Sequence, residues 1–341
     1  MPSLIKSIAR NIIFPIINET GVNRLIAKNA NKNLLILNYH GVIPEPDFEI
    51  SPNHLKASEF EKQIQYFSRH YNVLNPNELI DLNSKQIKKN KINIIITFDD
   101  GYENNYQFAF PILKKYNCPA IIFPVTSLID TNEATWYDKI DITKSQITEE
   151  ILKKRIKPLI EEITGKTYSH FAIRDIKNEL KLLSTVEKEN FFDTYFKFIS
   201  SKSLSESTLA PYFKMLSKKQ IRELLESNLI HFGSHTHTHP NLDSISSEAM
   251  EYELNTSKVI LEDITKMEIN SIAFPDGAYN SNVKVTARRK NYKIQYAVNF
   301  RHDNDQFEND IFKRFSVSNT TNAASTIFHA LKTLKTNGMQ I

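Results

Sequence analysis

The sequence predicts an α/β fold made of alternating strands and helices and interrupted once by a helical insertion. Short, almost uninterrupted apolar runs of strand length alternate with amphipathic segments on both sides of the middle of the chain. Runs of that composition suit strands covered on both faces, as in parallel sheets. Residues from about 130 to 213 are instead rich in Lys and Glu and lack strand-like runs. They predict a helical insertion.

Composition narrows the class of protein further. The chain has 341 residues, 40% hydrophobic and 24% charged, with 21 Phe and 14 Tyr, which is enough for a substantial core and excludes a disordered or fibrous chain. The net charge of +4 is too small to favour nucleic acid as a partner. The single cysteine, Cys118, excludes an internal disulfide and a cysteine-based metal site.

Residues 1–33 form an N-terminal amphipathic segment. Apolar residues recur in it at near-helical spacing, at Leu4, Ile5, Ile8, Ile12 and Ile13. Such a helix either packs on its own domain or lies peripherally on the inner face of a membrane. Because we recognise neither a secretory signal nor an apolar run of membrane-spanning length, the expected location is the cytoplasm.

The expected domain consists of residues 34–129 and 214–341, with 130–213 inserted. Its first part contains strands at 34–42, 92–98 and 120–125 and helices at about 56–70 and 106–115. Its second part contains strands at 229–233, 271–275 and 296–299 and a helix at about 250–264. The strand–helix–strand order fits a βα barrel or a layered sheet.

Two adjacent carboxylates, Asp99 and Asp100, follow the strand at 92–98. They repel each other, so each needs its own stabilising partner, and a cation on one of them is the most economical. The carboxyl ends of strands are where α/β folds build their sites. The alternative is an Asp-Gly turn in which one carboxylate caps the next helix.

Four of the ten histidines lie within nine residues, from His231 to His239. His235 and His239 are four residues apart, so on a helical turn both imidazoles reach one ion, whereas His237 points elsewhere. One carboxylate and two neutral imidazoles leave coordination positions open, as in a catalytic zinc site. The alternative is a solvated histidine-rich loop.

These segments together resemble a known family. TFDDG at 97–101, HTHTHPNL at 235–242 and AFPDGAYN at 273–280 are similar to the first three motifs of the polysaccharide deacetylases, the NodB-homology group of carbohydrate esterase family 4. LNYHGV at 37–42 resembles the opening strand of one branch. The resemblance covers roughly residues 34–128 and 213–318, and it implies a distorted (β/α) barrel.

The resemblance also implies a metal centre with a catalytic base. Asp100, His235 and His239 would hold a divalent metal, zinc by default, with cobalt or nickel able to replace it. Asp99 would be the general base, and the backbone N–H of Asp276 would help to stabilise the oxyanion.

The general acid is expected to be His40. In much of the family this role belongs to a C-terminal histidine, for which this chain offers His329. In the branch that opens with a Tyr-His-Gly strand, the early histidine protonates the leaving amine, which favours His40 over His329. The alternatives are a strand-end histidine bonded to the backbone for His40 and helix packing for His329.

The sequence departs from the family at several positions. The arginine that orients the base is missing near Asn270, and Arg314 is the candidate to replace it or to contact substrate, the alternative being a solvent-facing arginine. Trp136 is a candidate to stack on a sugar ring, or else packs in the core of the inserted helices. Tyr279 is a further candidate for substrate binding. Because the insertion follows a strand end, it could form a lid.

We therefore expect a metal-dependent hydrolase that removes N-acetyl groups from an amino sugar of a surface polysaccharide, a glycan or its lipid-linked precursor. An O-acetyl esterase acting on carbohydrate is the alternative among enzymes. If the protein is not an enzyme, the alternative is a non-catalytic carbohydrate-binding protein with a deacetylase fold. The absence of a Gly-x-Ser-x-Gly motif disfavours a serine nucleophile.

Overall fold

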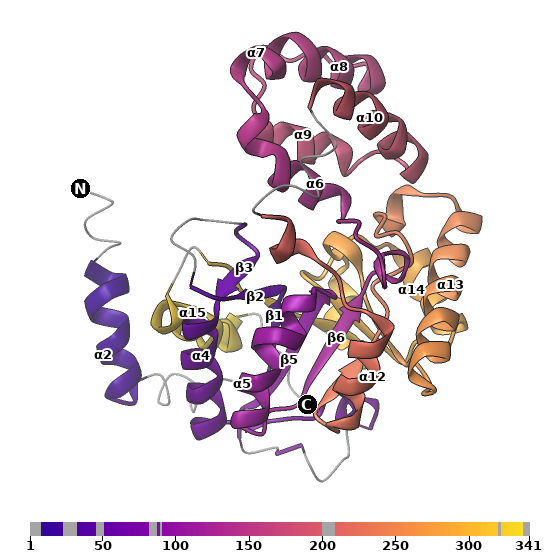
Figure 1. The fold of residues 1–341 in the computed structure, drawn as a ribbon. Coiled ribbons are helices and arrows are strands. Elements are labelled where there is room, and N and C mark those ends of the chain that lie inside the picture. The colour runs from indigo at the N-terminus through magenta and orange to yellow at the C-terminus, as the bar shows by residue number, and fades with distance from the viewer. Residues whose placement is uncertain are drawn as a thin grey trace.

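The computed structural model describes residues 8–22, 33–45, 51–81, 87–88, 91–199, 209–319 and 322–336. Short parallel strands form the centre of the molecule (Figure 1). They are β1 (Leu34–Tyr39), β2 (Gly41–Ile43), β3 (His54–Lys56), β4 (Asn72–Val73), β5 (Asn93–Asp100), β6 (Ala120–Pro124), β7 (Ile230–Phe232), β8 (Ser271–Ala273), β9 (Ile294–Ala297), β10 (Ile311–Lys313) and β11 (Phe315–Ser316).

The strands close into a barrel through two junctions. One sheet runs β11-β1-β5-β6-β7, with β4 beside β5, and the other runs β10-β9-β8, while β2 pairs with β3. Ser234, just after β7, bridges to β8, since its N–H donates to the Ser271 carbonyl and its carbonyl accepts from Ala273, both at 2.9 Å. On the other side only Arg314 separates β10 from β11. The expected distorted (β/α) barrel is confirmed.

The barrel helices lie outside the strands. They are α4 (Ala57–His70), α5 (Phe110–Lys115, preceded by a π-helical turn at Asn105–Ala109), α12 (Lys218–Glu226), α13 (Ser247–Thr265), α14 (Ser281–Arg289) and α15 (Ala323–Thr336). The predicted apolar face of α4 is real, because Phe60, Ile64 and Phe67 are completely buried. Burying a side chain of this size contributes roughly 1.5–3 kcal/mol.

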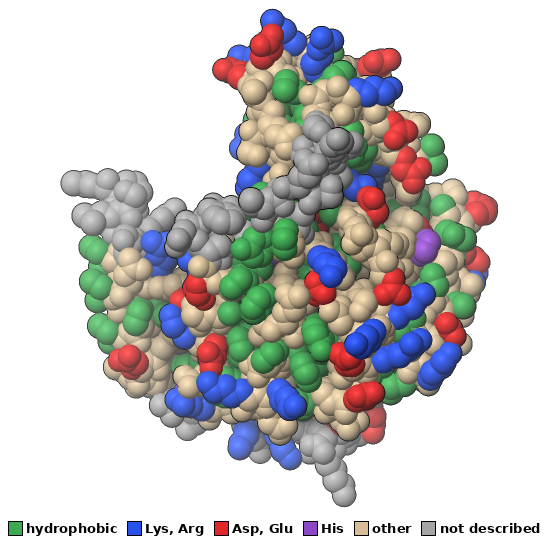
Figure 2. Space-filling view, viewed as in Figure 1, with side chains coloured by type: hydrophobic (Ala, Val, Ile, Leu, Met, Phe, Trp, Pro, Cys, Tyr) green, Lys and Arg blue, Asp and Glu red, His purple; other side chains and the backbone are tan. Residues whose placement is uncertain are grey.

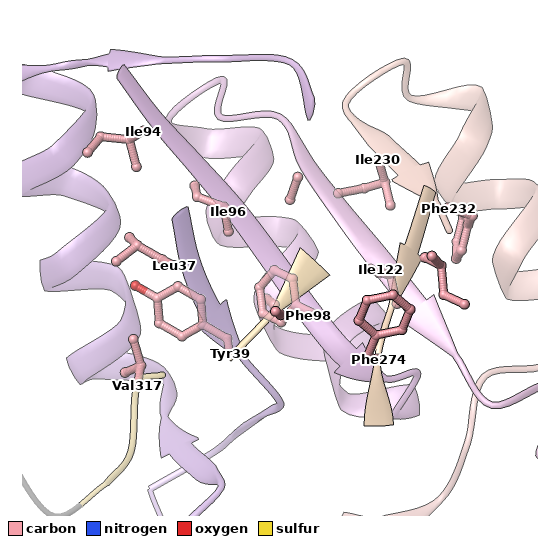
Figure 3. Packing of buried hydrophobic residues seen from close by; sticks show 14 of the residues in the cluster. Leu37, Tyr39, Ile94, Ile96, Phe98, Ile122, Ile230, Phe232, Phe274 and Val317 are labelled. Carbon is pink, nitrogen blue, oxygen red and sulfur yellow. The ribbon is translucent and has the colours of Figure 1, made fainter. Parts of the chain in front are cut away.

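Alternation along β5 decides which side chains face the helices and which face the barrel interior. Ile94, Ile96 and Phe98 join Leu37 and Tyr39 in the apolar cluster that includes α4 and α5 (Figure 3). The intervening residues belong to a second cluster inside the barrel, with Leu34, Ile36, Ile95, Ile121 and Phe123. Successive side chains of a strand point to opposite faces, so the residue after Phe98 enters the barrel.

The inserted lobe is described at residues 130–199 and 209–213, and its helices project from the barrel after β6 (Figure 1). These helices are α6 (Trp136–Thr143), α7 (Glu149–Ile151), α8 (Lys157–Thr164), α9 (Ile173–Leu180) and α10 (Thr185–Phe198). The lobe has its own apolar cluster, which includes Ile140, Ile156 and Phe191. Its outer face carries charges of both signs (Figure 2). As predicted, the described part of this segment contains no strand.

At the N-terminus a π-helical turn, Ala9–Ile13, leads into α2 (Phe14–Glu19). The ring of Phe14 stacks on Phe328 of α15, with centroids 4.6 Å apart, so the helix packs on its own domain. Its other side leaves Ile12 and Ile16 more than half exposed. The predicted apolar positions Leu4 and Ile5 lie outside the described residues. Among those described, none of the helices has the length and apolarity to cross a membrane.

Candidate active site

The two adjacent carboxylates, Asp99 and Asp100, point in opposite directions, which reduces their mutual repulsion. Asp99 points into the barrel, where both of its oxygens accept hydrogen bonds from Arg314, at 2.7 and 2.8 Å. Asp100 has a left-handed backbone, with φ 71°, and faces His235 and His239. Each carboxylate therefore has its own environment.

Arg314 is the partner of Asp99 and is itself held by the barrel interior. Its guanidinium also donates to Asn38 Oδ1 at 3.1 Å and to Thr97 Oγ1 at 3.2 Å, and its side chain is completely buried. Burial raises the pKa of the Asp99 carboxyl, but Arg314 and His235 outweigh it and hold that pKa well below its usual range. Arg314 therefore neither faces solvent nor lies where it could contact the substrate directly.

Asp100, His235 and His239 form a compact cluster of metal-ligand type. Asp100 Oδ1 lies 3.6 Å from His235 Nε2 and 3.7 Å from His239 Nε2. One ligand atom from each residue lies within 4.8 Å of the others, and all three residues are buried. Both oxygens of Asp100 are buried and accept no hydrogen bond of standard geometry from the residues that the structure describes.

An ionised carboxylate in that position is strongly unfavourable unless a cation compensates it. The cluster of one carboxylate and two imidazoles fits a divalent cation such as zinc. Burial, followed by the neighbouring His235, lowers the pKa of His239 to about 4, so its imidazole is neutral near pH 7 and keeps a lone pair for a cation.

A loop, and not the helical turn predicted from the spacing, brings the two histidines together. Thr236 and His239 have positive φ angles of 67° and 61°, which fold the loop so that the imidazole centroids lie 4.8 Å apart. His235 Nδ1 lies 2.8 Å from the Ala273 carbonyl, which makes it the protonated nitrogen and leaves Nε2 free for a ligand. His237 points away and contacts Thr126, as predicted.

Glu253 of α13 holds this loop and was not predicted from the sequence. Its carboxylate accepts bonds from the backbone N–H groups of His237 and Thr238, both at 2.8 Å, and from the Thr238 hydroxyl at 2.6 Å. The one signal in the sequence is that Glu253 is a charged residue in an amphipathic helix. The structure shows that this position is buried, with the residue 5% exposed.

His40 lies at the carboxyl end of β1, beside the end of β5 where the two carboxylates lie. Its Nδ1 is buried and has no hydrogen-bond partner among the described residues, so this nitrogen is not bonded to their backbone. Gly41 leaves room for the ring of His54, because a Cβ at this position would lie 2.4 Å from that ring. His329 lies instead on the outer helix α15, against Phe14, so of these two candidates for the general acid it is His40 that lies near Asp99.

Asp276 lies in a tight turn after β8, at the same edge of the barrel. Its backbone is left-handed, with φ 52°, and the bonds that close the turn come from the N–H groups of Gly277 and Ala278. The turn therefore does not use the N–H of Asp276. The Asp276 side chain accepts a bond from Lys181 of the inserted lobe at 2.8 Å, which ties the lobe to this turn.

The two aromatic candidates differ in where they lie. Tyr279 is in the core, 1% exposed, with its hydroxyl 2.5 Å from Asp305, so the expected substrate contact is not supported by its position. Trp136 is 9% exposed but lines a cavity of about 910 Å³ between the inserted lobe and the barrel. His239 lines the same cavity, and the ring of Tyr137 lies 5.2 Å from that of His239. The lobe thus lies over one side of the site.

The family model for polysaccharide deacetylases matches residues 86–295, more than half of the chain. The chain therefore belongs to the polysaccharide deacetylase family.

Among curated relatives, the chain is 29% identical over 181 residues to the putative polysaccharide deacetylase YxkH of Bacillus subtilis, covering 52% of this chain and 58% of that protein. It is 35% identical over 133 residues to the poly-β-1,6-N-acetyl-D-glucosamine N-deacetylase of Staphylococcus epidermidis, covering 33% and 46%. The chain thus spans about half the length of the curated relatives it matches.

Among solved structures, the deacetylase PplD of Streptococcus pyogenes has a TM-score of 0.56 at 19% identity, covering 89% of this chain and 99% of that chain. IcaB from Ammonifex degensii has a TM-score of 0.55 at 17% identity, covering 89% and 98%. Likeness at these identities is a likeness of fold.

Proposed function

We propose that this chain is a metal-dependent hydrolase that removes the N-acetyl group from an amino sugar of a surface polysaccharide, a glycan or its lipid-linked precursor. The observation that carries the proposal is the buried Asp100 carboxylate, whose oxygens accept no hydrogen bond of standard geometry from the described residues and which faces two imidazole Nε2 atoms. The N-acetylglucosamine polymer named for several curated relatives supports an N-acetylated amino sugar as the substrate class.

The chain's own residues supply the groups that amide hydrolysis needs. Asp100, His235 and His239 would hold a divalent cation, zinc by default, which would supply Lewis acidity toward the acetyl carbonyl and acidify water. Asp99, kept ionised and oriented by Arg314, accepts the proton of the attacking water.

Two further groups complete the reaction. The N–H of Asp276 donates to the oxyanion that develops as the new C–O bond forms. His40 protonates the sugar nitrogen as the C–N bond breaks, which releases acetate and the free amine.

Metal analysis tests the first part of the proposal. We expect one divalent ion per chain in the wild type and its loss in His235→Ala, because that imidazole is one of three ligands. His237→Ala is the matched control, since this neighbouring histidine contacts Thr126 and Tyr252 instead. Full occupancy in His235→Ala would contradict the site.

Mass spectrometry of N-acetylated glycans tests the activity. We expect the wild type to remove the mass of one acetyl group per reacted sugar, and Asp99→Asn to bind metal normally but remove none. Removal of acetyl groups from O-acetylated glycans alone would make the protein an esterase. Glycan binding without any loss would make it a carbohydrate-binding protein.

A further inference from the structure

Lys188 is a buried cation without a counter-ion in the cavity beside the candidate metal centre. It lies near the start of α10, is 6% exposed, and lines the same cavity of about 910 Å³ as His239. Within the part of the chain that the structure describes, Lys188 makes neither an ion pair nor a hydrogen bond. An ammonium on so buried a side chain, open to the cavity but lacking both contacts, is unfavourable and requires a physical explanation.

The carboxylates nearest to Lys188 are already engaged elsewhere. Asp276, Glu187 and Glu253 all attract its charge. However, Asp276 accepts a hydrogen bond at 2.8 Å from Lys181, at the end of α9. Glu187 accepts a hydrogen bond at 2.7 Å from the backbone N–H of Ser184, which caps α10. Glu253 accepts three bonds from the histidine loop. None of the three serves as the counter-ion of Lys188.

The other lysines of the cavity differ from Lys188 in this respect. Lys139 pairs with Glu133 at 3.0 Å, and Lys214 pairs with Glu103 at 3.2 Å. The cavity also includes the acidic residues Glu189 and Asp193, but both are exposed, so water screens their charges. Lys188 is therefore the lysine in this cavity whose charge remains uncompensated.

Trp136 supports the ammonium from one side and leaves the other side for a ligand. The Lys188 Nζ lies 5.1 Å from the Trp136 ring, within the range of a cation–π contact. An aromatic face attracts a cation but accepts no directional hydrogen bonds of full strength, so the ammonium donors remain for a group in the cavity. Burial lowers the pKa of Lys188 to about 8, which leaves most of the side chain charged near pH 7.

We infer that Lys188 binds an anionic oxygen of the substrate, from a phosphate or a carboxylate carried on or next to the N-acetylated sugar. The inference rests on the proposed function, because it places the anion in the cavity that His239 also lines. Charge-assisted hydrogen bonds to phosphate or carboxylate oxygens are strong and fit an ammonium that lacks partners. A neutral N-acetylglucosamine polymer offers Lys188 no such group.

Three matched N-acetylhexosamine substrates test the inference: a neutral oligosaccharide, one with a neighbouring uronic acid, and one with a phosphate at the reducing end. The wild type should prefer one or both anionic substrates in kcat/KM by about ten- to hundredfold, mainly through KM. In Lys188→Met this preference should fall to near one. Preference for only the phosphorylated or only the uronic substrate identifies the source of the anion.

Control variants separate charge recognition from general damage. Lys139→Met removes a lysine of the same cavity that is already paired, and it should keep the preference. Lys188→Arg retains the charge and should restore part of it. An equal preference in the wild type and Lys188→Met, or an equal loss on all three substrates, would overturn the inference.

A binding measurement keeps the inference testable if none of the substrates is cleaved. We would titrate the wild type and Lys188→Met with N-acetylglucosamine, N-acetylglucosamine 1-phosphate and glucuronate in a calorimeter. Tighter binding of an anionic probe by the wild type alone supports the anion site even if the proposed deacetylation fails. Equal binding of every probe by both proteins overturns the anion site, whatever the activity.

Discussion

Replacing Arg314 with Met tests whether this residue keeps Asp99 ionised and oriented. Two of its N–H groups donate to the two oxygens of Asp99, and the pair is buried inside the barrel. Met has a similar length and no charge, so the substitution leaves an uncompensated carboxylate without opening a large cavity.

The expected loss of stability is large. Removing one partner of a buried ion pair costs about 3–5 kcal/mol, because the remaining charge stays buried without compensation. Arg289→Met is the matched control. The Arg289 side chain is 61% exposed and lies 3.6 Å from Glu251, so its loss should change the free energy of unfolding by no more than about 0.5 kcal/mol.

Urea denaturation of Arg314→Met, Asp99→Asn and the double variant provides the assay. The two single losses should not add in the double variant, because each of them counts the same broken pair, and we expect a coupling energy of about 2 kcal/mol. Additive losses, or an Arg314→Met variant as stable as the Arg289→Met control, would refute the role of this pair.

The pH dependence of stability should also change sign. In the wild type the pKa of Asp99 is depressed, so its contribution to stability is present above the ordinary pKa of 3.8 and is lost only as the pH falls through the lower folded value. In Arg314→Met burial raises this pKa instead, so the folded protein holds the extra proton and stability falls as the pH rises. The deficit relative to the wild type should be larger at pH 8 than at pH 5.

Three further outcomes are expected. His40→Ala should slow N-deacetylation by roughly 10² to 10⁴-fold but O-deacetylation much less, since an amine leaves only after protonation. His329→Ala is the control, and equal losses on both substrates would give His40 a structural role. If the exposed Ile12 and Ile16 contact a membrane, deleting residues 1–30 should abolish sedimentation with anionic vesicles, while cleavage of a soluble analogue persists. A full-length protein that never sediments with vesicles would mean that this segment only packs on α15. Lys188→Met should raise the free energy of unfolding by about 1–3 kcal/mol at pH 7, with the gain shrinking as the pH rises from 8 to 10.5, and a less stable variant would contradict a buried unpaired charge.

The choice of residues at the centre of the site was accessible from the sequence because its chemistry is local. Asp99 and Asp100 follow an apolar run of strand length, and the histidines follow another. The carboxyl ends of parallel strands meet at one edge of a barrel, so these residues were expected to meet. The strand positions of β1, β5 and β6 were predicted within two or three residues for the same reason. Strands of two or three residues, such as β4 and β11, contain too few side chains for a periodic signal.

Local spacing was a poorer guide to backbone conformation. The four-residue interval between His235 and His239 suggested a helical turn, but two left-handed residues form a loop that brings the rings together by another path. A spacing is compatible with several backbone paths, and which one forms depends on what holds it. Here Glu253, on a helix later in the chain, supplies the hydrogen bonds.

The elements of the barrel, the residue types of the candidate metal centre and the family resemblance could all be predicted from the sequence, since each depends on short segments. The partners of these residues became visible only in the folded chain. Folding placed Arg314 against Asp99, which lies 215 positions earlier, buried Tyr279 in the core, and left Lys188 beside Trp136 without a counter-ion among the described residues. Burial and ion pairing depend on which distant segments pack together, and a local pattern records the type of a side chain but not its neighbours.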